Sequence, residues 1–139
     1  MAEPQGRPTL SALDRDECLK LISPGGVGRV AYDDGEGPTV TPVNYVVDGE
    51  AIIFRTSLAG RLNKNIGGLP SGGEVRIAFE VDRIDPERRA GWSVLLRGGA
   101  RQLEDDEDSA DVEPWPAESR PARVRLTAKD ITGRRLGGG

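Results

Sequence analysis

The sequence contains no histidine and only one cysteine among its 139 residues. Without histidine, the chain cannot build a histidine-assisted serine or cysteine nucleophile, a histidine-ligated metal site or a histidine-ligated haem. Cys18 has no second cysteine to pair with inside the chain, and its apolar neighbours predict a buried, structural thiol. We therefore expect no metal centre, and these absences leave any catalytic residue unknown.

Long apolar runs and an excess of positive charge are also missing. No run approaches the roughly 18 apolar residues of a membrane span. The N-terminal sequence MAEPQGRPTL lacks the apolar core of a secretory signal. The net charge of −4 argues against a nucleic-acid-binding surface, which is normally basic. These observations predict a cytoplasmic protein that contacts neither membrane nor nucleic acid.

The chain does contain many short strand-like runs, and 36% of its residues are hydrophobic, enough for one domain with one core. Ser11 or Asp14 can cap a helix that runs to about residue 23, and the Asp14 register adds a capping box with Glu17. A second short helix is expected at 59–66. The expected strands are 27–32, 38–47, 50–56, 74–81 and 91–103, with a closing pair at 122–126 and 131–136. Six or seven strands with few helices are typical of a mainly β (α+β) antiparallel barrel or sandwich.

Residues 41–65 carry the strongest local pattern. Asp48-Gly49 suits a two-residue type I′ turn, and that register pairs residues whose numbers add up to 97. Alternation along the strands gives a core face and a half-polar face. The core face is Val43, Tyr45, Val47, Ile52 and Phe54. The half-polar face is Pro42, Asn44, Ala51, Ile53, Arg55 and Ser57. Pro42 also predicts an edge strand or a bulge, because proline cannot donate to a sheet.

The strand end at 55–57, Arg-Thr-Ser, predicts an anion site because a short basic helix follows it. Backbone N–H groups at a helix start favour phosphate, and arginine adds a bidentate donor pair. The alternative is a surface hairpin with a solvated arginine. The glycine-rich residues 67–73 favour a flexible loop; the alternative is a phosphate-cradling loop, although the sequence matches neither the P-loop nor the dinucleotide-binding motif. Gly98-Gly99 predicts a bulge or bend, and the acidic residues 104–113 predict a solvated loop or a frayed helix.

Several motifs in order resemble one known family. They are DECLKLI, GGVGRVAY, TPVNYVVDG, IIFRTSLAGRL, VRIAFEVDRID, GWSVLLRGGAR and ITGRRL. Each motif is weak alone, but their order and spacing resemble the pyridoxamine 5′-phosphate oxidase-like, flavin-binding split-barrel family, above all its short bacterial members. The resemblance covers residues 10–136 as one flavin-binding domain, with a flexible tail at 1–9 and a glycine tail at 137–139.

The resemblance implies a split antiparallel β-barrel that forms a homodimer, with FMN or a deazaflavin coenzyme at the interface. Carried over by position, the expected phosphate contacts are Arg55, Thr56, Ser57, Arg61 and Lys64. The strand containing Pro42, Val43 and Asn44 would lie along the flavin ring. Trp92, in the Gly-Trp-Ser motif, would reach the cofactor or the subunit contact.

The implied function is a flavin-dependent oxidoreductase of unassigned substrate. The cofactor would carry the redox chemistry, with a small-molecule redox substrate and reduced nicotinamide as a candidate electron donor. Ala90 stands where similar sequences often carry histidine, and substrate residues of the vitamin-processing oxidases are not found, so the vitamin B6 substrate is not transferred. The alternatives are a flavin- or deazaflavin-binding module without turnover, and a cofactor-free interaction barrel.

Overall fold

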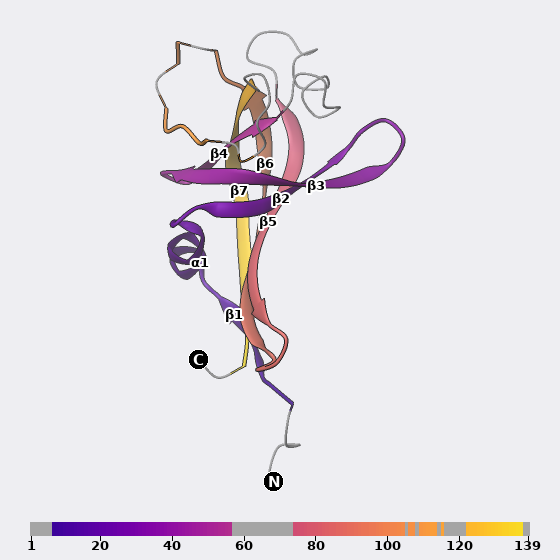
Figure 1. The fold of residues 1–139 in the computed structure, drawn as a ribbon, viewed down its shortest axis with the longest axis vertical. Helices are drawn as coiled ribbons and strands as arrows, with labels where there is room; N and C mark the ends of the chain where they lie inside the picture. Colours follow the sequence, from indigo (N-terminus) through magenta and orange to yellow (C-terminus); the bar gives the residue numbers. More distant parts are fainter. Residues whose placement is uncertain are drawn as a thin grey trace.

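The computed structural model describes residues 7–56, 74–104, 106–107, 109–113, 115 and 122–137. Within these residues the chain forms one helix and seven strands (Figure 1). The elements are β1 (Leu10–Leu13), α1 (Arg15–Ile22), β2 (Gly26–Asp33), β3 (Pro38–Asp48), β4 (Ala51–Thr56), β5 (Val75–Asp85), β6 (Ala90–Gln102) and β7 (Ala122–Leu136). The helix predicted at 59–66 and the loop predicted at 67–73 lie outside the described residues.

Six of the strands close into an antiparallel barrel, as the sequence predicted. The strand order is β1-β7-β4-β3-β2-β5-β6, and an additional pairing of β6 with β7 closes the ring. β1 adds to the outside of the ring by pairing with the last residues of β7. β1 is not among the predicted strands, because its residues are mostly exposed and show no alternation of buried apolar side chains. In Figure 1, β6 and β7 run along the long axis and the β2–β3 hairpin projects to one side.

Helix α1 begins as the capping-box pattern predicts. The Asp14 carboxylate accepts from the Glu17 backbone N–H at 2.8 Å, and the Glu17 side chain accepts in return from the Asp14 N–H at 3.3 Å. The helix buries Cys18 and Ile22 completely, and the Tyr45 hydroxyl donates to the Ile22 carbonyl at 2.8 Å. Burial raises the pKa of the Cys18 thiol, which agrees with a structural rather than a reactive cysteine.

The core lies inside the ring and is built from the inward residues of every barrel strand. Phe79 is its centre: its ring lies 5.4 Å from the Tyr45 ring and 5.6 Å from the Phe54 ring, centroid to centroid. Tyr45, Ile52 and Phe54 are buried, so the predicted core face of the β3–β4 hairpin is correct. The outward Ala51 and Ile53 are buried as well, so β4 is covered on both faces.

The predicted register of the β3–β4 hairpin is wrong by one position. Asp48 pairs with Ala51, so the turn is Gly49-Glu50 and paired residue numbers add up to 99. Gly49 has φ of 64°, while Glu50 has no positive φ, which fits a turn with glycine first rather than a type I′ turn. Asp48 stays in the strand because its carboxylate accepts from Arg125 Nη1 at 3.1 Å. The faces are unchanged, because odd residues of β3 still share a face with even residues of β4.

Two further predictions concern the end of the chain. The closing pair predicted at 122–126 and 131–136 is one continuous strand, β7. Its partner β6 pairs Arg97 with Asp130 but Gly98 with Ala128, so Lys129 is an extra residue opposite the glycines. This irregularity confirms the bulge predicted at Gly98-Gly99. The apparent break at 128–130 is therefore a kink within β7 and not a turn between two strands.

Pro42 lies at an edge, as predicted. Among the described residues, β3 pairs with β4 from Tyr45 to Asp48, so there the only strand paired with β3 at Pro42 is β2. Proline has no N–H to donate to a second strand, which suits this position. This open stretch of β3 carries the residues that the family resemblance places along a flavin ring.

Candidate functional site

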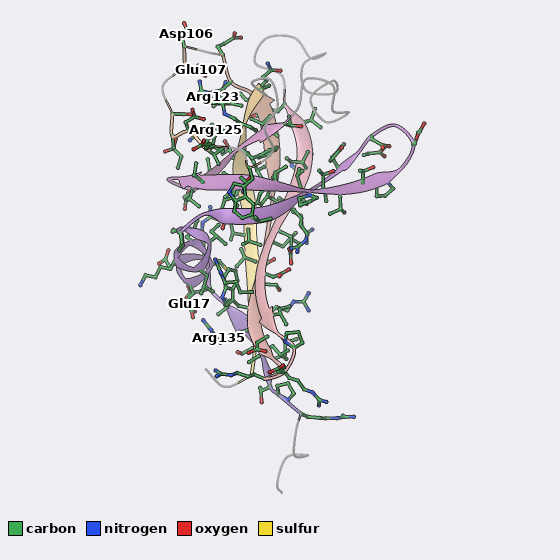
Figure 2. The ribbon with its side chains drawn as sticks, viewed as in Figure 1. Glu17, Asp106, Glu107, Arg123, Arg125 and Arg135 are labelled. Atoms are coloured by element: carbon green, nitrogen blue, oxygen red, sulfur yellow. The ribbon has the colours of Figure 1, made fainter. Side chains whose placement is uncertain are left out.

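Four arginines lie together on the outer face at one end of the barrel. Arg55 of β4 pairs with Arg123 of β7, and Arg125 of β7 pairs with Arg101 of β6. Alternation along these strands directs all four side chains away from the core, whose inward neighbours include Phe54, Val124 and Ala100. We call Arg55, Arg101, Arg123 and Arg125 the arginine cluster. Figure 2 labels Arg123 and Arg125 at the upper end of the molecule, beneath Asp106 and Glu107.

Arg55 is an almost completely enclosed member of the arginine cluster. Its side chain is only 8% exposed. Its Nη2 donates to Asp111 Oδ1 at 2.8 Å and Oδ2 at 3.0 Å, and its Nε donates to Asp111 Oδ1 at 3.1 Å and to the Val112 carbonyl at 3.2 Å. A bidentate arginine–carboxylate pair of this kind has the donor geometry that also suits phosphate.

The other three arginines are also bound by polar groups, most of them from residues 104–113, which we call the acidic segment. Glu107 pairs with Arg101 at 2.9 Å, and Asp48 pairs with Arg125 at 3.1 Å. Arg123 is 9% exposed and donates to the Ser109 hydroxyl at 3.0 Å and to the carbonyls of Glu104 and Glu107 at 2.8 and 2.9 Å. The described part of the segment contains no helix, and its Val112 is buried. The predicted loop is thus present, but it is held against the barrel rather than solvated.

The electrostatics of the cluster keep its carboxylates ionised. Burial alone would raise the pKa of Asp111, but the Val112 backbone N–H and Arg55 outweigh it, and the pKa lies below its ordinary value. The pKa of Glu107 is also lowered, first by the Arg101 side chain and then by the Glu104 backbone N–H. Arg55 and Arg101 therefore face carboxylates that are ionised at neutral pH.

Asn44 lies on the open stretch of β3, near the arginine cluster. Its side-chain oxygen accepts from the Trp115 backbone N–H at 2.8 Å. By alternation Asn44 and Pro42 share the outer face with Arg55, whereas Val43 points inward and packs against the core. The Trp115 side chain is 77% exposed. Asn44 and Arg55, two of the residues predicted to contact a cofactor, thus each contact residues between 111 and 115.

The remaining predicted site residues are placed differently. Thr56 ends β4, and alternation directs its side chain to the face opposite Arg55. Ser57, Arg61 and Lys64 lie outside the described residues. Trp92 is 9% exposed and its side chain belongs to the core. Its backbone position in β6 is paired with Arg83 of β5 and with Arg135 of β7. Along β7, Arg135 lies on the order of 40 Å from Arg123, at about 3.3 Å per residue. Within one chain, Trp92 and Arg55 are therefore at opposite ends of the barrel.

Arg101, Arg123 and Arg125 are not marked as site residues by the sequence. Each occupies an outward position in a strand, where arginine is ordinary, so no local motif marks them. The only sequence pattern that could have indicated them is the spacing of Arg123 and Arg125, which places both on one face of a strand. That this face is shared with Arg55 follows only from the pairing of β4 with β7. Their partner, the acidic segment, was read as a solvated charge run for the same reason.

A second charged group lies on the outer face of β2 and β5. Arg29 Nη1 lies 3.2 Å from Glu80 Oε1 and 3.3 Å from Asp82 Oδ2. Burial raises the pKa of Glu80 to about 7, a hydrogen bond and charge repulsion from Asp82 add to the rise, and Arg29 opposes it. Glu80 also lines a groove of about 580 Å³, whose lining includes no member of the arginine cluster. This carboxyl could hold a proton near neutral pH.

The described residues contain no cluster of histidine, cysteine and acidic side chains arranged to hold a metal ion. Within the same residues, no helix has the length and apolar character needed to cross a bilayer.

Comparison with known proteins identifies relatives over almost the whole chain. Rv0080, an uncharacterized protein of Mycobacterium tuberculosis, is 32% identical over 139 residues, covering 97% of this chain and 91% of the relative. The solved structure of the FAD binding protein from Mycobacterium smegmatis is 27% identical with a TM-score of 0.65, covering 91% of this chain and 98% of that one. A FAD-binding protein from Mesorhizobium loti has a TM-score of 0.71 and covers 94% and 99% of the two chains, and at 20% identity it shows the fold alone.

The family model described as pyridoxamine 5′-phosphate oxidase matches residues 14–135. The match runs from the N-cap of α1 almost to the end of β7, so it contains all six strands of the closed barrel. It agrees with the barrel topology and with the order of motifs in the sequence. The chain therefore belongs to the pyridoxamine 5′-phosphate oxidase family.

Proposed function

We propose that this protein is an FMN-dependent oxidoreductase of unassigned substrate that binds its cofactor at a homodimer interface. The family match supports a redox role, and the FAD binding protein of M. smegmatis supports a flavin as the cofactor. The observation that supports the proposal most strongly is the enclosed guanidinium of Arg55, which binds the Asp111 carboxylate on the same outer face as Asn44.

The residues present fit the phosphate of a flavin nucleotide. Arg55 is 8% exposed and holds two oxygens of one carboxylate at 2.8 and 3.0 Å, which is the arrangement two phosphate oxygens would adopt. Arg123 lies directly opposite on β7 and adds positive charge. A neutral ligand would gain little from this donor set, so the arrangement favours a phosphorylated flavin over riboflavin.

A bound flavin would supply the redox chemistry, accepting electrons from a donor such as reduced nicotinamide. The chain itself would bind and orient it. Arg55 would fix the phosphate, and Asn44 would lie along the ring, where its side-chain NH2 group could donate hydrogen bonds while its oxygen accepts from the Trp115 N–H. Ser57, Arg61 and Lys64 are proposed as further phosphate ligands on the strength of the family resemblance. We assign no catalytic residue.

A homodimer is proposed because two features call for a partner. Large apolar side chains are exposed: Leu10, Val40 and Ile84 are 56%, 62% and 56% exposed, respectively. In addition, two residues predicted to contact the cofactor, Trp92 and Arg55, lie at opposite ends of the barrel within one chain. Two antiparallel copies would bring the Trp92 end of one chain to the Arg55 end of the other.

FAD is a second candidate cofactor. The M. smegmatis relative is named as a FAD binding protein, and the four arginines provide more positive charge than one phosphate requires. FAD and FMN share the phosphate next to the ribityl chain, so both would use Arg55. Native mass spectrometry of freshly purified protein separates FMN, FAD and a deazaflavin by mass and reports the number of subunits in the same measurement.

Titration calorimetry with FMN and riboflavin tests the proposed phosphate site. Arg55→Ala should weaken FMN binding by about ten- to a hundredfold, since a hydrogen bond to a charged group contributes about 1.5–3 kcal/mol. Riboflavin, which lacks the phosphate, should bind both proteins alike. Arg29→Ala is the matched control, because Arg29 also pairs with carboxylates but lies on β2. Arg61→Ala tests the sequence prediction at a position outside the described residues. FMN binding that is unchanged in Arg55→Ala would place the phosphate elsewhere.

Turnover separates the oxidoreductase from its alternatives. A protein that purifies yellow and oxidises reduced nicotinamide supports the enzyme. A yellow protein without turnover of any electron donor supports a binding module, and a colourless protein that binds no added flavin or deazaflavin supports an interaction barrel.

A further inference from the structure

The acidic segment and Trp115, just beyond it in the chain, contact the two described residues that the proposed function assigns to opposite parts of the flavin. Asp111 binds Arg55, the proposed phosphate ligand, and the Trp115 backbone N–H binds Asn44, the proposed ring contact. The two contacts come from positions four residues apart in the chain. Both are made on the outer face of β3 and β4, where the proposed function places the flavin nucleotide.

We propose that Asp111 is an internal competitor for the cofactor phosphate, occupying the Arg55 guanidinium when no flavin is bound and leaving it when the phosphate arrives. This inference rests on the proposed function. It makes Asp111 a residue that sets the affinity of the site for phosphorylated flavins, although it lies in a charge run that has no binding motif.

The two partners of this ion pair differ in their freedom to move. Arg55 projects from a strand that is paired on both sides, and its side chain is 8% exposed, whereas the Asp111 side chain is 57% exposed and belongs to no helix or strand. Asp111 can turn into water, where a carboxylate is well solvated. Arg55 cannot do so without leaving the sheet, and an enclosed guanidinium left without an anion is costly. The carboxylate is therefore the partner that exchanges.

The exchange favours a phosphate for reasons of charge and donor count. A phosphomonoester carries a charge of about −1.5 to −2 at neutral pH and three acceptor oxygens. The Asp111 carboxylate carries a charge of −1 and two oxygens. Arg123, paired with Arg55 across the strands, adds a second positive charge to the attraction. A phosphate can therefore replace Asp111, whereas riboflavin has no group that competes for the guanidinium.

Asp111→Asn tests the proposal by removing the competing charge and keeping the shape. The asparagine oxygen can still accept from the Val112 N–H, as Asp111 Oδ1 does at 2.8 Å. FMN should bind this variant about tenfold more tightly than wild type, since a charge-assisted pair no longer has to be broken. Riboflavin affinity should change by less than about twofold on the same reasoning.

Asp106→Asn is the matched control. Asp106 is an exposed carboxylate of the same segment, and the part of the chain that the structure describes gives it no ion-pair partner. The substitution makes the same change in net charge, so it measures general electrostatic repulsion of FMN. Unfolding midpoints of the three proteins check that each is folded. Equal FMN affinities of the Asp111 and Asp106 variants, or weaker binding by Asp111→Asn, would overturn the proposal.

The outcomes also separate this inference from the proposed function. If Arg55→Ala loses FMN affinity and Asp111→Asn gains none, the phosphate site stands and the competition is wrong. If Arg55→Ala retains full FMN affinity, the phosphate is not at Arg55 and both proposals fall. Inorganic phosphate gives a readout without flavin. Amide exchange at 109–113 should be faster in phosphate than in chloride at equal ionic strength, and unchanged exchange would count against displacement.

Discussion

The two ends of the barrel are closed in different ways. At the end covered by α1, Cys18 and Ile22 are buried completely, and packing is so close that a Cβ added at Gly133 would lie 2.6 Å from Cys18 Sγ. At the upper end, the arginine cluster is covered by the acidic segment through ion pairs and carbonyl contacts. Shape and apolar burial hold the first end, whereas charge holds the second. An end held by exchangeable charge is suited to admitting an anionic ligand, and an end closed by apolar packing is not.

The largest loss of stability should come from a substitution at the end covered by α1. Ile22→Ala removes a fully buried side chain from the helix that closes the barrel, and should lower the free energy of unfolding by about 2–5 kcal/mol. Urea denaturation measures this. If Ile22→Ala lowered the free energy of unfolding by less than Arg123→Leu does, the comparison would fail, because α1 would then not be needed to complete the core.

Arg123→Leu should produce a smaller loss at the upper end. The substitution keeps an apolar stem on β7 but removes the donors to the Glu104 and Glu107 carbonyls and the Ser109 hydroxyl. The expected cost is about 1–3 kcal/mol. Amide exchange should speed up at 109–113 and stay unchanged in α1. Faster exchange in α1 as well would show that the two ends are coupled.

Acidification should release the upper end with the smallest effect on global stability. The pKa values of Asp111 and Glu107 are lowered from ordinary values of 3.8 and 4.5, so their ion pairs contribute fully above those values and are lost as the pH falls through the lower folded values. Between pH 6 and pH 3, amide exchange at 109–113, corrected for its intrinsic pH dependence, should rise before exchange at Ser23 and Gly25, whose N–H groups donate to the Leu19 and Ile22 carbonyls at the end of α1. Simultaneous loss of protection at both ends would indicate global unfolding and contradict a separately held segment.

Local patterns predicted the parts of the fold that short-range physics controls. The Asp14–Glu17 capping box placed the start of α1, and the alternation in β3 and β4 placed Tyr45 and Phe54 in the core. The faces stayed correct although the turn was misplaced by one residue. Side chains in strands alternate with a period of two, so a shift of one residue at both sides of a turn changes partners but not faces.

The candidate site could be predicted only in part. Asn44 and Arg55 were singled out by the hairpin pattern and the family resemblance, and in the structure Arg55 contacts Val112 and Asn44 contacts Trp115, three positions further along the chain. The pairing of β4 with β7 joins residues nearly 70 positions apart, so no sequence window contains both Arg55 and Arg123. The same holds for Asp111, which meets Arg55 across 56 positions.

The sequence by itself determined the family, the barrel class, the helix start and the inward face of each central strand, because caps, alternation and motif order are all short-range signals. Only the tertiary structure decided which charges meet. Ion pairs follow from how distant strands are placed, and the same acidic run would be a solvated loop beside a neutral surface. It is held against this barrel because the closing of β4, β6 and β7 lines up four arginines beneath it.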